Sequence, residues 1–420
     1  MKLLVYSPKI TSRLRYIFNL VFRDVLLINP DFTSNPEEFI NYGGHKISYG
    51  EFPLKDELFF KSSSFLFENR IQPASCDYKN LSADFFSLAF FLVSRYEEYL
   101  PFKPDSNGRF DPRDSMAFKK NFLQKPTVNI GALKIKEEIS KKFPDFIFPD
   151  FKFRFIPTID IDNAYAYCEK GFVRTFGAYT RSLLKADFTD IAERTNVLVG
   201  KKRDPYDVFD YLITLQKEKG FNPIFFILLA DYGMNDKNVP HTSKKFQSLL
   251  KGISDYAEVG IHPSYNSSQN KELLKTEVSR LSGILNKEIT KSRQHFLKLS
   301  LPETYRNLLQ LGITDDFTMG YASEQGFRAG ICTPYFFYDL LNEAETALKI
   351  HPFCLMEGTF KYYKRIPAHK ALDEMKPIVD EVKNVHGTLY TLWHNEFFSN
   401  EEEFKGWRKV FEELVDYAGF

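Results

Sequence analysis

The feature that most constrains this chain is an apolar stretch, residues 155–162, that ends in two carboxylates one residue apart. Side chains at positions i and i+2 of a strand point to the same face, so Asp160 and Asp162 can converge on one point. Two neighbouring carboxylates repel each other, and a bound cation or a shared proton relieves that repulsion most simply. The pair is therefore a candidate metal and general-base site, although two acids that merely end a strand beside a loop give the same pattern.

The length of the chain predicts two domains, because 420 residues exceed the size at which one hydrophobic core stops growing. In the first part, residues 24–29 predict a strand and residues 84–100 an apolar helix. Residues 143–150 are rich in proline and phenylalanine and indicate a linker. We therefore expect an N-terminal α/β accessory domain over residues 1–150 and a second domain over residues 151–420. Alternating charges ahead of the linker predict a structural ion-pair cluster formed by Arg109, Asp111, Arg113 and Asp114.

The second part of the chain alternates apolar strand-like runs with helical periods. The seven predicted strands cover residues 154–162, 222–230, 258–262, 293–299, 348–356 and 388–392, with a short one ending at 315–316. Such alternation indicates parallel strands joined by crossover helices, in either a barrel or a doubly wound sheet. A doubly wound sheet would carry a Gly-rich phosphate turn after its first strand, and its absence from the sequence favours the barrel.

Residues able to do chemistry stand at the C-terminal ends of most of these strands. They are Asp160, Asp162, Asp231, His262, Asp315, Asp316, Glu357 and His394. The exceptions are Arg293 and His295, which stand at the start of their predicted strand. In a parallel barrel the site is built at the C-terminal rim from the ends of several strands. This joint placement favours function for histidines that would individually be taken as satisfied core or loop residues.

Composition excludes several classes of function. Lys and Arg total 56 against 55 Asp and Glu, a formal charge of +1, which argues against a nucleic-acid or anionic-membrane surface as the main partner. The four cysteines are far apart, and scattered free thiols fit a reducing compartment. The N-terminus contains no signal-peptide core, and no apolar run is long enough to span a bilayer. We therefore expect a cytoplasmic protein.

A hydrolytic metal site needs nitrogen or oxygen ligands, a base to deprotonate water and an acid for the leaving group. We expect Asp162 and His262 to bind the metal. Asp160 would be the base, kept ionised and oriented by Arg293, and His394 would be the acid.

Four motifs resemble those of polysaccharide deacetylases of the NodB-homology type, or carbohydrate esterase family four. They are Thr158-Ile-Asp-Ile-Asp162, Gly260-Ile-His-Pro-Ser-Tyr265, Arg293-Gln-His-Phe and Leu392-Trp-His394. The resemblance covers residues 151–420 and implies a distorted seven-stranded (β/α) barrel. It also implies one divalent metal, usually zinc, that activates water to remove an N- or O-acetyl group from a sugar.

The same resemblance implies roles for individual residues. Asp160 matches the family's base, Asp162 and His262 match its metal ligands, and Arg293 and His394 match the residues of the third and last motifs. The segments Arg95-Tyr-Glu-Glu-Tyr99 and Gly108-Arg-Phe-Asp111 ahead of the barrel look like those of the cytoplasmic deacetylase-like proteins of Bacteroidetes.

One position departs from the family pattern. The family carries another histidine four residues after the first in its second motif, and here that position is Asn266. An amide is a weak zinc ligand compared with imidazole. His295 is our candidate for the third ligand, with the alternative that it only braces its strand.

Several further side chains are candidates for substrate contact. Tyr265, Trp393 and Tyr321 could supply stacking faces for a sugar, and Arg328 could grip an anionic group of the substrate.

The leading interpretation is a metal-dependent carbohydrate deacetylase that acts on a cytoplasmic glycan precursor or a nucleotide-linked sugar. A second interpretation keeps the fold and removes the chemistry, giving a catalytically inactive glycan-binding or assembly protein, as Asn266 allows. A third takes Asp160 and Asp162 as the divalent-metal motif of a nucleotide-sugar glycosyltransferase, a class that does not require histidines at successive strand ends. The sequence leaves the sugar, the oligomeric state and the role of residues 1–150 open.

Overall fold

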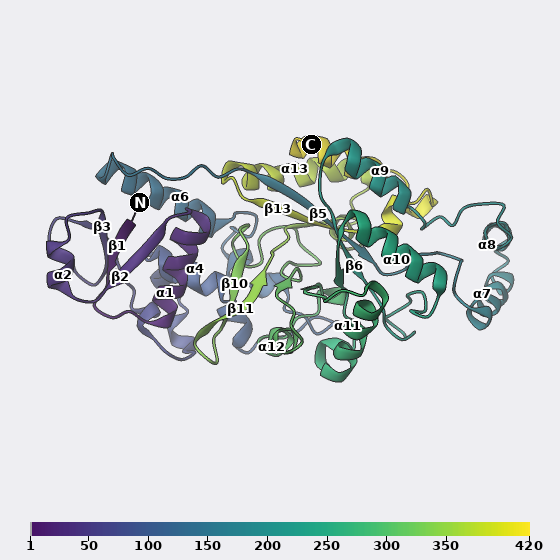
Figure 1. Cartoon of the computed structure of the whole chain (residues 1–420), viewed down its shortest axis with the longest axis horizontal. Coiled ribbons are helices and arrows are strands. Elements are labelled where there is room, and N and C mark those ends of the chain that lie inside the picture. The colour runs from purple at the N-terminus through teal and green to yellow at the C-terminus, as the bar shows by residue number, and fades with distance from the viewer. Residues whose placement is uncertain (1) are drawn as a thin grey trace.

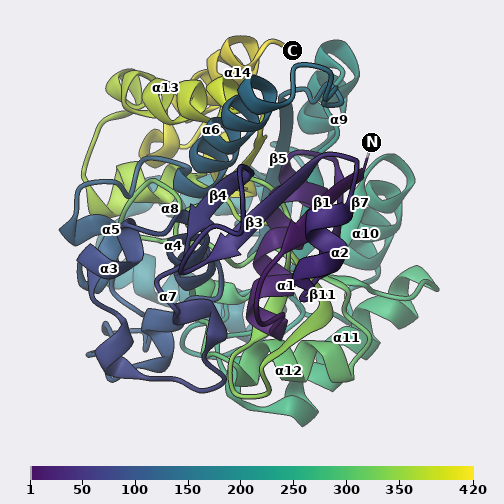
Figure 2. The same cartoon turned by 90° about the vertical axis from the view of Figure 1, so that its left-hand side faces the viewer.

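The computed structural model describes residues 2–420, which contain two separate β-sheets. The first has four parallel strands in the order β2-β1-β3-β4 and lies at the left of Figure 1 and toward the viewer in Figure 2. Its strands are β1 (Lys2–Tyr6), β2 (Asn29–Thr33), β3 (Lys46–Gly50) and β4 (Leu58–Lys61). The helices around it are α1 (Ser12–Asn19), α2 (Pro36–Asn41), α3 (Tyr78–Ser82), α4 (Phe85–Val93), α5 (Met116–Lys119) and α6 (Thr127–Lys142).

Two predictions for this part need correction. Residues 20–25 form a π-helical turn at the end of α1, so the strand predicted over residues 24–29 is wrong and β2 starts only at its last residue. The helix predicted over residues 84–100 ends at Val93, because Arg95 takes a left-handed conformation with φ 53°. At its start Asp84 caps the helix, accepting hydrogen bonds from the next backbone amides as a good N-cap does.

The second sheet has nine strands in the order β10-β11-β9-β8-β7-β6-β5-β13-β12. All neighbours are parallel except β10 and β11. The strands are β5 (Arg154–Ile161), β6 (Ile224–Ile227), β7 (Glu258–Ile261), β8 (Lys291–Ser292), β9 (Asp315–Asp316), β10 (Tyr335–Asp339), β11 (Ala344–Ile350), β12 (Leu355–Met356) and β13 (Thr388–His394). The protein is therefore a mixed α/β fold with parallel sheets.

The larger sheet curls until its edges approach each other. The strand predicted over residues 348–356 is in fact two strands, β11 paired with β9 and β12 paired with β13, separated by four residues. His351 spans the remaining gap, with Nε2 2.7 Å from Oδ1 of Asp315 in β9 and Nδ1 2.9 Å from the hydroxyl of Tyr390 in β13. Within residues 2–420 no strand pairs with both β9 and β13, so the closed seven-stranded barrel is not confirmed.

The concave side of this curl is filled with apolar side chains. They come from β6, β12 and β13 and from the segments after β8, β9 and β11, and comprise Ile224, Phe226, Leu297, Phe317, Ala322, Phe353, Met356, Tyr390 and Leu392. The inside of the sheet is thus a packed core, which leaves the ends of the strands as the place for a site.

Helices connect the strands of this sheet. They are α7 (Phe172–Leu184), α8 (Phe188–Leu198), α9 (Phe209–Lys219), α10 (Lys244–Tyr256), α11 (Lys271–Leu285), α12 (Glu303–Gln310), α13 (Ala368–Asn384) and α14 (Trp407–Ala418). The pair α7 and α8, which the sequence did not predict, projects at the right-hand end of Figure 1. None of the helices in residues 2–420 combines the length and the apolar character needed to cross a membrane.

The two parts of the chain are joined by a buried network of charges. Glu98 accepts hydrogen bonds from Nε of Arg95 at 2.8 Å and from Nη2 of Arg328 at 2.6 Å. The guanidinium of Arg95 also donates to the backbone carbonyl of Arg328. Because α6 ends at Lys142 and β5 begins at Arg154, we keep a domain boundary near residue 150 as a proposal.

Candidate active site

The candidate site lies where several parallel strands of the larger sheet end. Asp162 directly follows β5, His262 directly follows β7, and His394 is the last residue of β13. The register of β13 against β5 places His394 opposite Asp160. Parallel strands end at the same edge of a sheet, which is why residues far apart in the sequence meet here.

The strand predicted over residues 293–299 is wrong. This error had concealed that Arg293 follows the end of a strand, as the other residues of the site do. Strand β8 ends at Ser292, so Arg293 also follows a strand end. Residues 295–297 form a 3-10 turn in which Phe296 and Leu297 adopt left-handed φ angles of 59° and 54°. Such angles cost energy for residues other than glycine and are most often kept at functional sites.

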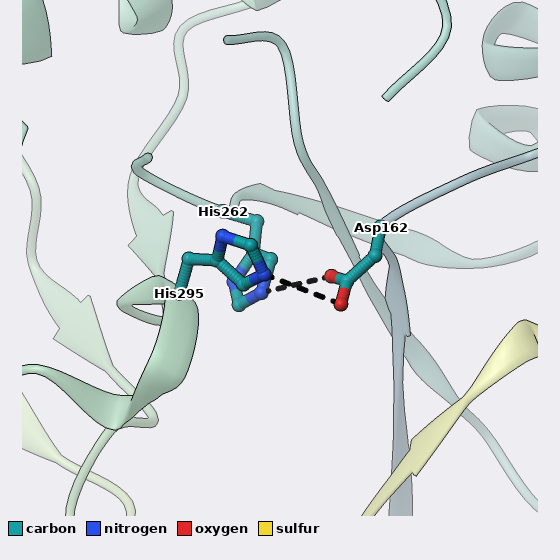
Figure 3. A group of neighbouring side chains, drawn as sticks. All are labelled: Asp162, His262 and His295. Carbon is teal, nitrogen blue, oxygen red and sulfur yellow. Dashed lines mark ion pairs between the residues drawn. The ribbon is translucent and has the colours of Figure 1, made fainter. Parts of the chain in front are cut away.

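Three side chains at this edge form a potential metal-binding cluster. Nε2 of His262 lies 3.2 Å from Oδ1 of Asp162, and Nε2 of His295 lies 3.3 Å from its Oδ2. One ligand atom from each residue lies within 4.8 Å of the others, and Figure 3 shows both imidazoles facing the carboxylate. Two imidazole nitrogens and one carboxylate oxygen are a common protein ligand set for catalytic zinc.

The other ring nitrogen of each histidine has its own partner. Nδ1 of His262 lies 2.5 Å from the carbonyl oxygen of Arg293, and Nδ1 of His295 lies 2.8 Å from Oδ1 of Asp236. These partners fix the ring orientation and leave both Nε2 atoms facing Asp162, as in metal sites. Nε2 of His262 and Oδ1 of Asp162 are buried without a hydrogen-bond partner in residues 2–420, which a bound cation would provide.

The charges of the cluster are strongly coupled. Burial disfavours the ionised form of Asp162, but His295 and His262 hold the pKa of its carboxyl well below the usual range. Burial also disfavours the charged form of His295, yet Asp162 and Asp236 outweigh it and raise its pKa to about 9. The cluster thus presents an ionised carboxylate that already attracts positive charge.

A second carboxylate is held beside the cluster by a buried arginine. Nη1 of Arg293 lies 3.0 Å from Oδ1 of Asp160 and donates to the hydroxyl of Thr158 at 2.5 Å. The guanidinium also lies over the ring of Phe226, 4.7 Å from its centroid. Oδ2 of Asp160 is 3.6 Å from Nε2 of His262. The arginine therefore binds one oxygen of Asp160 and leaves the other facing the cluster.

His394 approaches the cluster from the opposite side. Its Nδ1 lies 2.6 Å from Oε1 of the buried Glu357, and its Nε2 lies 3.9 Å from Oδ2 of Asp162. Burial lowers the pKa of His394, but Glu357, Asp162 and Asp160 together raise it well above its usual value. The ring is therefore a proton donor whose Nε2 points into the site.

These groups share one cavity of about 200 Å³. Its polar lining includes Asp160, Asp162, His262, Gln294, His295, His394 and Glu396, and its apolar and aromatic lining includes Phe296, Leu297, Ala322, Met356, Tyr362, Tyr363, Leu392 and Phe397. Polar groups converging within an apolar lining are typical of small-molecule sites.

The N-terminal part contributes Arg109 to this cavity. Arg109 pairs with Asp105 at 2.8 Å, and Arg113 pairs with Asp111 at 2.5 Å. Of the ion-pair cluster predicted for Arg109, Asp111, Arg113 and Asp114, only the pair of Arg113 and Asp111 forms among the described residues, and Asp114 lies beside Lys119 instead. Arg109 in addition donates to the carbonyl oxygen of Phe296 at 2.9 Å. It thus holds the strained turn next to the metal-binding cluster.

The sequence reasoning gave no role to three acidic residues of the site. Glu357 had been placed at the end of a predicted strand, and that position alone was sufficient to mark it as a candidate residue of the site. Glu396 lines the cavity two residues after His394, and burial raises its pKa to about 7 although His394 lowers it. Asp236, the partner of His295, lies in a long loop after β6, where no sequence pattern marks it.

Other predicted residues lie elsewhere. Arg328 is buried against Glu98 and does not line the cavity. Trp393 is 1% exposed and packs on Phe398 and Phe411 in the hydrophobic core. Tyr321 is buried, with its hydroxyl 3.1 Å from Nη2 of Arg95.

The end of the second motif lies outside the cavity, although His262 of the same motif lines it. The hydroxyl of Tyr265 lies 3.5 Å from the carbonyl oxygen of Asn107, and Nζ of Lys298 lies 4.1 Å from the centre of its ring. Asn266 is exposed to solvent. The position at which the resembled family has its second histidine is therefore not part of the cluster here, whereas His295 is.

Comparison with known proteins adds the following. Residues 3–144 match the model of a family of unknown function, DUF7033. No curated protein sequence matches the chain. Among solved structures, a polysaccharide deacetylase from Mycobacterium smegmatis is 14% identical, with a TM-score of 0.40 over 64% of this chain and 86% of that one.

Two further structural neighbours are similarly distant. The catalytic domain of a peptidoglycan N-acetylglucosamine deacetylase from Eubacterium rectale has 11% identity and a TM-score of 0.32, over 66% of this chain and 89% of that one. A CE4 family pseudoenzyme from Bacillus anthracis has 10% identity and a TM-score of 0.32, over 65% of this chain and 63% of that one. The chain thus spans less than two thirds of the pseudoenzyme's length. Likenesses of this degree do not identify an activity.

Proposed function

We propose that this chain is a metal-dependent hydrolase that removes an N- or O-acetyl group from a carbohydrate. One observation carries the proposal. The cluster of Asp162, His262 and His295 opens on the same cavity as the arginine-held Asp160 and the carboxylate-held His394. Ligands, a base and an acid at one point are the parts that hydrolysis of an acyl bond requires.

Zinc is the metal that this ligand set favours. Asp162, His262 and His295 would hold it, with His295 taking the place that Asn266 leaves open in the resembled family. When bound, the metal would lower the pKa of a water molecule and polarise the acetyl carbonyl. Asp236 and the carbonyl of Arg293 would keep the two imidazoles in the correct orientation.

Asp160 would accept the proton of the attacking water. Its Oδ1 is occupied by Arg293, so Oδ2, which faces His262, is the oxygen left to take the proton. The charge-assisted hydrogen bond from the guanidinium stabilises the orientation of the carboxylate.

His394 would give a proton to the leaving amine or hydroxyl of the sugar. Its Nδ1 is bound to Glu357, so Nε2 is the atom that faces the substrate. Glu357 keeps the ring protonated, and after the transfer the products are acetate and the free amine or alcohol of the sugar.

The cavity limits the part of the substrate that is enclosed. At about 200 Å³ it is smaller than typical pockets for drug-sized ligands, which supports entry of the acetyl group with part of one sugar. Phe296, Tyr362 and Tyr363 offer aromatic faces along its wall. A glycan precursor or nucleotide-linked sugar as substrate, and a cytoplasmic location, are further parts of the proposal.

Acetate release tests the proposal. The zinc-loaded protein is incubated with N-acetylated and O-acetylated sugars and sugar nucleotides, and acetate is measured enzymatically. Asp160→Asn is expected to retain zinc and lose activity by a factor of about 10² to 10⁴, the usual contribution of a general base. Asp231→Asn, which changes an exposed acid in the loop after β6 that is paired with Arg280, should behave as the parent. A parent protein that binds zinc and releases no acetate from any of these compounds contradicts the activity and leaves a glycan-binding role.

A further inference from the structure

A second pocket lies beside the projecting helix α7, close to the candidate active site. Its volume is about 340 Å³, and four basic side chains, Lys170, Arg174, Arg181 and Arg194, line it together with Tyr232. Among the described residues its lining contains no carboxylate. Figure 1 shows α7 and α8 at the right-hand end of the molecule.

Three of the four cations of this pocket, Lys170, Arg174 and Arg181, form no ion pair among the described residues. Arg194 pairs through Nη2 with Asp190 at 3.1 Å, but its Nε is buried without a partner in residues 2–420. Arg174 donates only to neutral carbonyl oxygens, those of Lys237 and Asn238. Arg181 forms no ion pair within the part of the chain that the structure describes. Within residues 2–420, Asp190 is thus the one carboxylate that forms an ion pair with any of these four side chains.

Lys170 is the least expected of the four, because it is 8% exposed. Its ammonium group donates to the side-chain oxygen of Asn163. Burial, followed by the charge of Arg174, lowers its pKa to about 7, although Asp204 and Glu396 act in the opposite direction. Buried cations that repel one another persist at a cost, and an anion placed among them removes that cost.

The position of the pocket connects it with the chemistry. Asn163, which holds Lys170, directly follows the cluster residue Asp162. The backbone carbonyl of Asn163 in turn accepts a hydrogen bond from Asn395, the residue after His394, at 3.1 Å. Asn163 therefore links the lysine of this pocket to the strand ends that carry Asp162 and His394.

We propose that this pocket binds the phosphate or diphosphate group of a phosphorylated sugar substrate, an inference that rests on the proposed function for the substrate's other end. Arginine guanidinium groups match the oxygens of phosphate in two-point contacts, and a lysine adds a point charge. The acetylated sugar then reaches the metal-binding cluster while its phosphate is held by α7 and α8.

A sugar phosphate of this kind has two chemical sources, a nucleoside diphosphate and a lipid diphosphate. The outer face of α7 exposes Phe172, Phe176 and Leu184, which are 84%, 64% and 83% exposed. Residues 170–186 contain four basic and no acidic residues. Basic helices with an exposed apolar face bind the surface of anionic bilayers. The test therefore includes a separate measurement for the lipid source.

Binding of inorganic pyrophosphate, measured by titration calorimetry with a chelator present, tests the pocket without metal or turnover. The full chain should bind one pyrophosphate, and Arg181→Glu should weaken binding about tenfold or more because it reverses an unpaired charge in the pocket. Lys185→Glu makes the same charge change at the exposed C-cap of the same helix, outside the pocket, and should change affinity by less than about twofold. No binding by the parent, or equal losses in both variants, overturns the assignment.

Two further ligands then distinguish a nucleoside diphosphate from a lipid diphosphate as the source of the phosphate. Displacement of pyrophosphate by uridine diphosphate, lost in Arg181→Glu, supports the nucleotide. Cosedimentation with phosphatidylglycerol vesicles but not with phosphatidylcholine vesicles, lost in both Arg181→Glu and Phe176→Asp, supports the lipid. If neither ligand binds through Arg181, the assignment to a substrate phosphate fails. If the chain binds pyrophosphate but releases no acetate, the phosphate site stands and the proposed deacetylase activity fails. If it releases acetate but does not bind pyrophosphate, the activity stands and the phosphate site fails.

Discussion

Replacing Glu98 with glutamine tests how the N-terminal part is fixed to the larger sheet. The carboxylate is 7% exposed and lies between Arg95 and Arg328, both of which are essentially inaccessible to solvent. It receives hydrogen bonds of 2.8 Å from Arg95 Nε and of 2.9 and 2.6 Å from Arg328 Nε and Nη2. These two guanidinium groups belong to segments more than 200 positions apart, so the network stabilises a tertiary contact and not a local one.

The expected loss follows from the charges that would be left behind. Glutamine keeps one oxygen acceptor but directs an NH₂ group at a guanidinium. Of the two buried cations, Arg95 would then keep the buried Glu97 as its carboxylate partner, and Arg328 would lose its ion pair. Breaking a buried ion pair by removing one partner typically costs about 3–5 kcal/mol, and the retained oxygen puts the expected loss near about 3 kcal/mol. That is a large share of a total stability of roughly 5–15 kcal/mol.

Urea unfolding followed by tryptophan fluorescence measures this loss, because Trp393 and Trp407 both lie in the core of the larger part. The control is Glu402→Gln, which alters an exposed ion pair with Lys405 and should change stability by less than about 0.5 kcal/mol. A loss below about 1 kcal/mol for Glu98→Gln would refute the reasoning, since it would mean that the pair is solvated or dispensable.

Three further predictions concern the site and its surroundings. Glu357→Gln should shift the alkaline limb of the pH profile of kcat/KM to lower pH, because the carboxylate raises the pKa of His394 and the active form carries the proton; an unshifted limb would exclude His394 as the acid. Asn266→Ala should leave zinc affinity unchanged within about twofold, since the side chain is exposed, and a loss of metal would place it in the ligand set. Trp393→Ala should lower the free energy of unfolding by about 3–5 kcal/mol and leave KM of the folded protein unchanged, and the reverse pattern would place the indole in the substrate site.

The part of the site that the sequence could predict follows from one rule. The carboxyl ends of parallel strands meet, so Asp162 and His262 could be paired although 100 positions separate them. Arg293 obeyed the same rule but was misplaced, because β8 has only two residues and is too short to show a period. The position of His295 depends on the left-handed turn that follows, which no local pattern specified.

The orientation of Trp393 could have been predicted from the sequence. Neighbouring residues of a strand point to opposite faces, so a tryptophan directly before His394 in β13 faces away from the site. In the structure it packs toward α14, on Phe411. Adjacency in sequence had suggested a substrate contact that the period of the strand argues against.

Other features depend on contacts between distant segments and leave no local signal. The partner of Arg328 is Glu98, 230 positions away, and the partner of His295 is Asp236, in an irregular loop. The same holds for His351, which bridges β9 and β13 through Asp315 and Tyr390. Composition and periodicity determine which segments become strands, whereas the pairing of buried charges is settled by tertiary packing.

The metal content of the purified protein tests the central claim most directly. After mild dialysis, elemental analysis of the parent should give about one zinc per chain, and Asp162→Ala and His295→Ala should both lose it. His369→Ala, which removes an exposed histidine at the start of α13, should retain it. A parent protein that contains no metal and takes up none on titration, or a His295→Ala variant that keeps its full zinc content and affinity, would contradict the account.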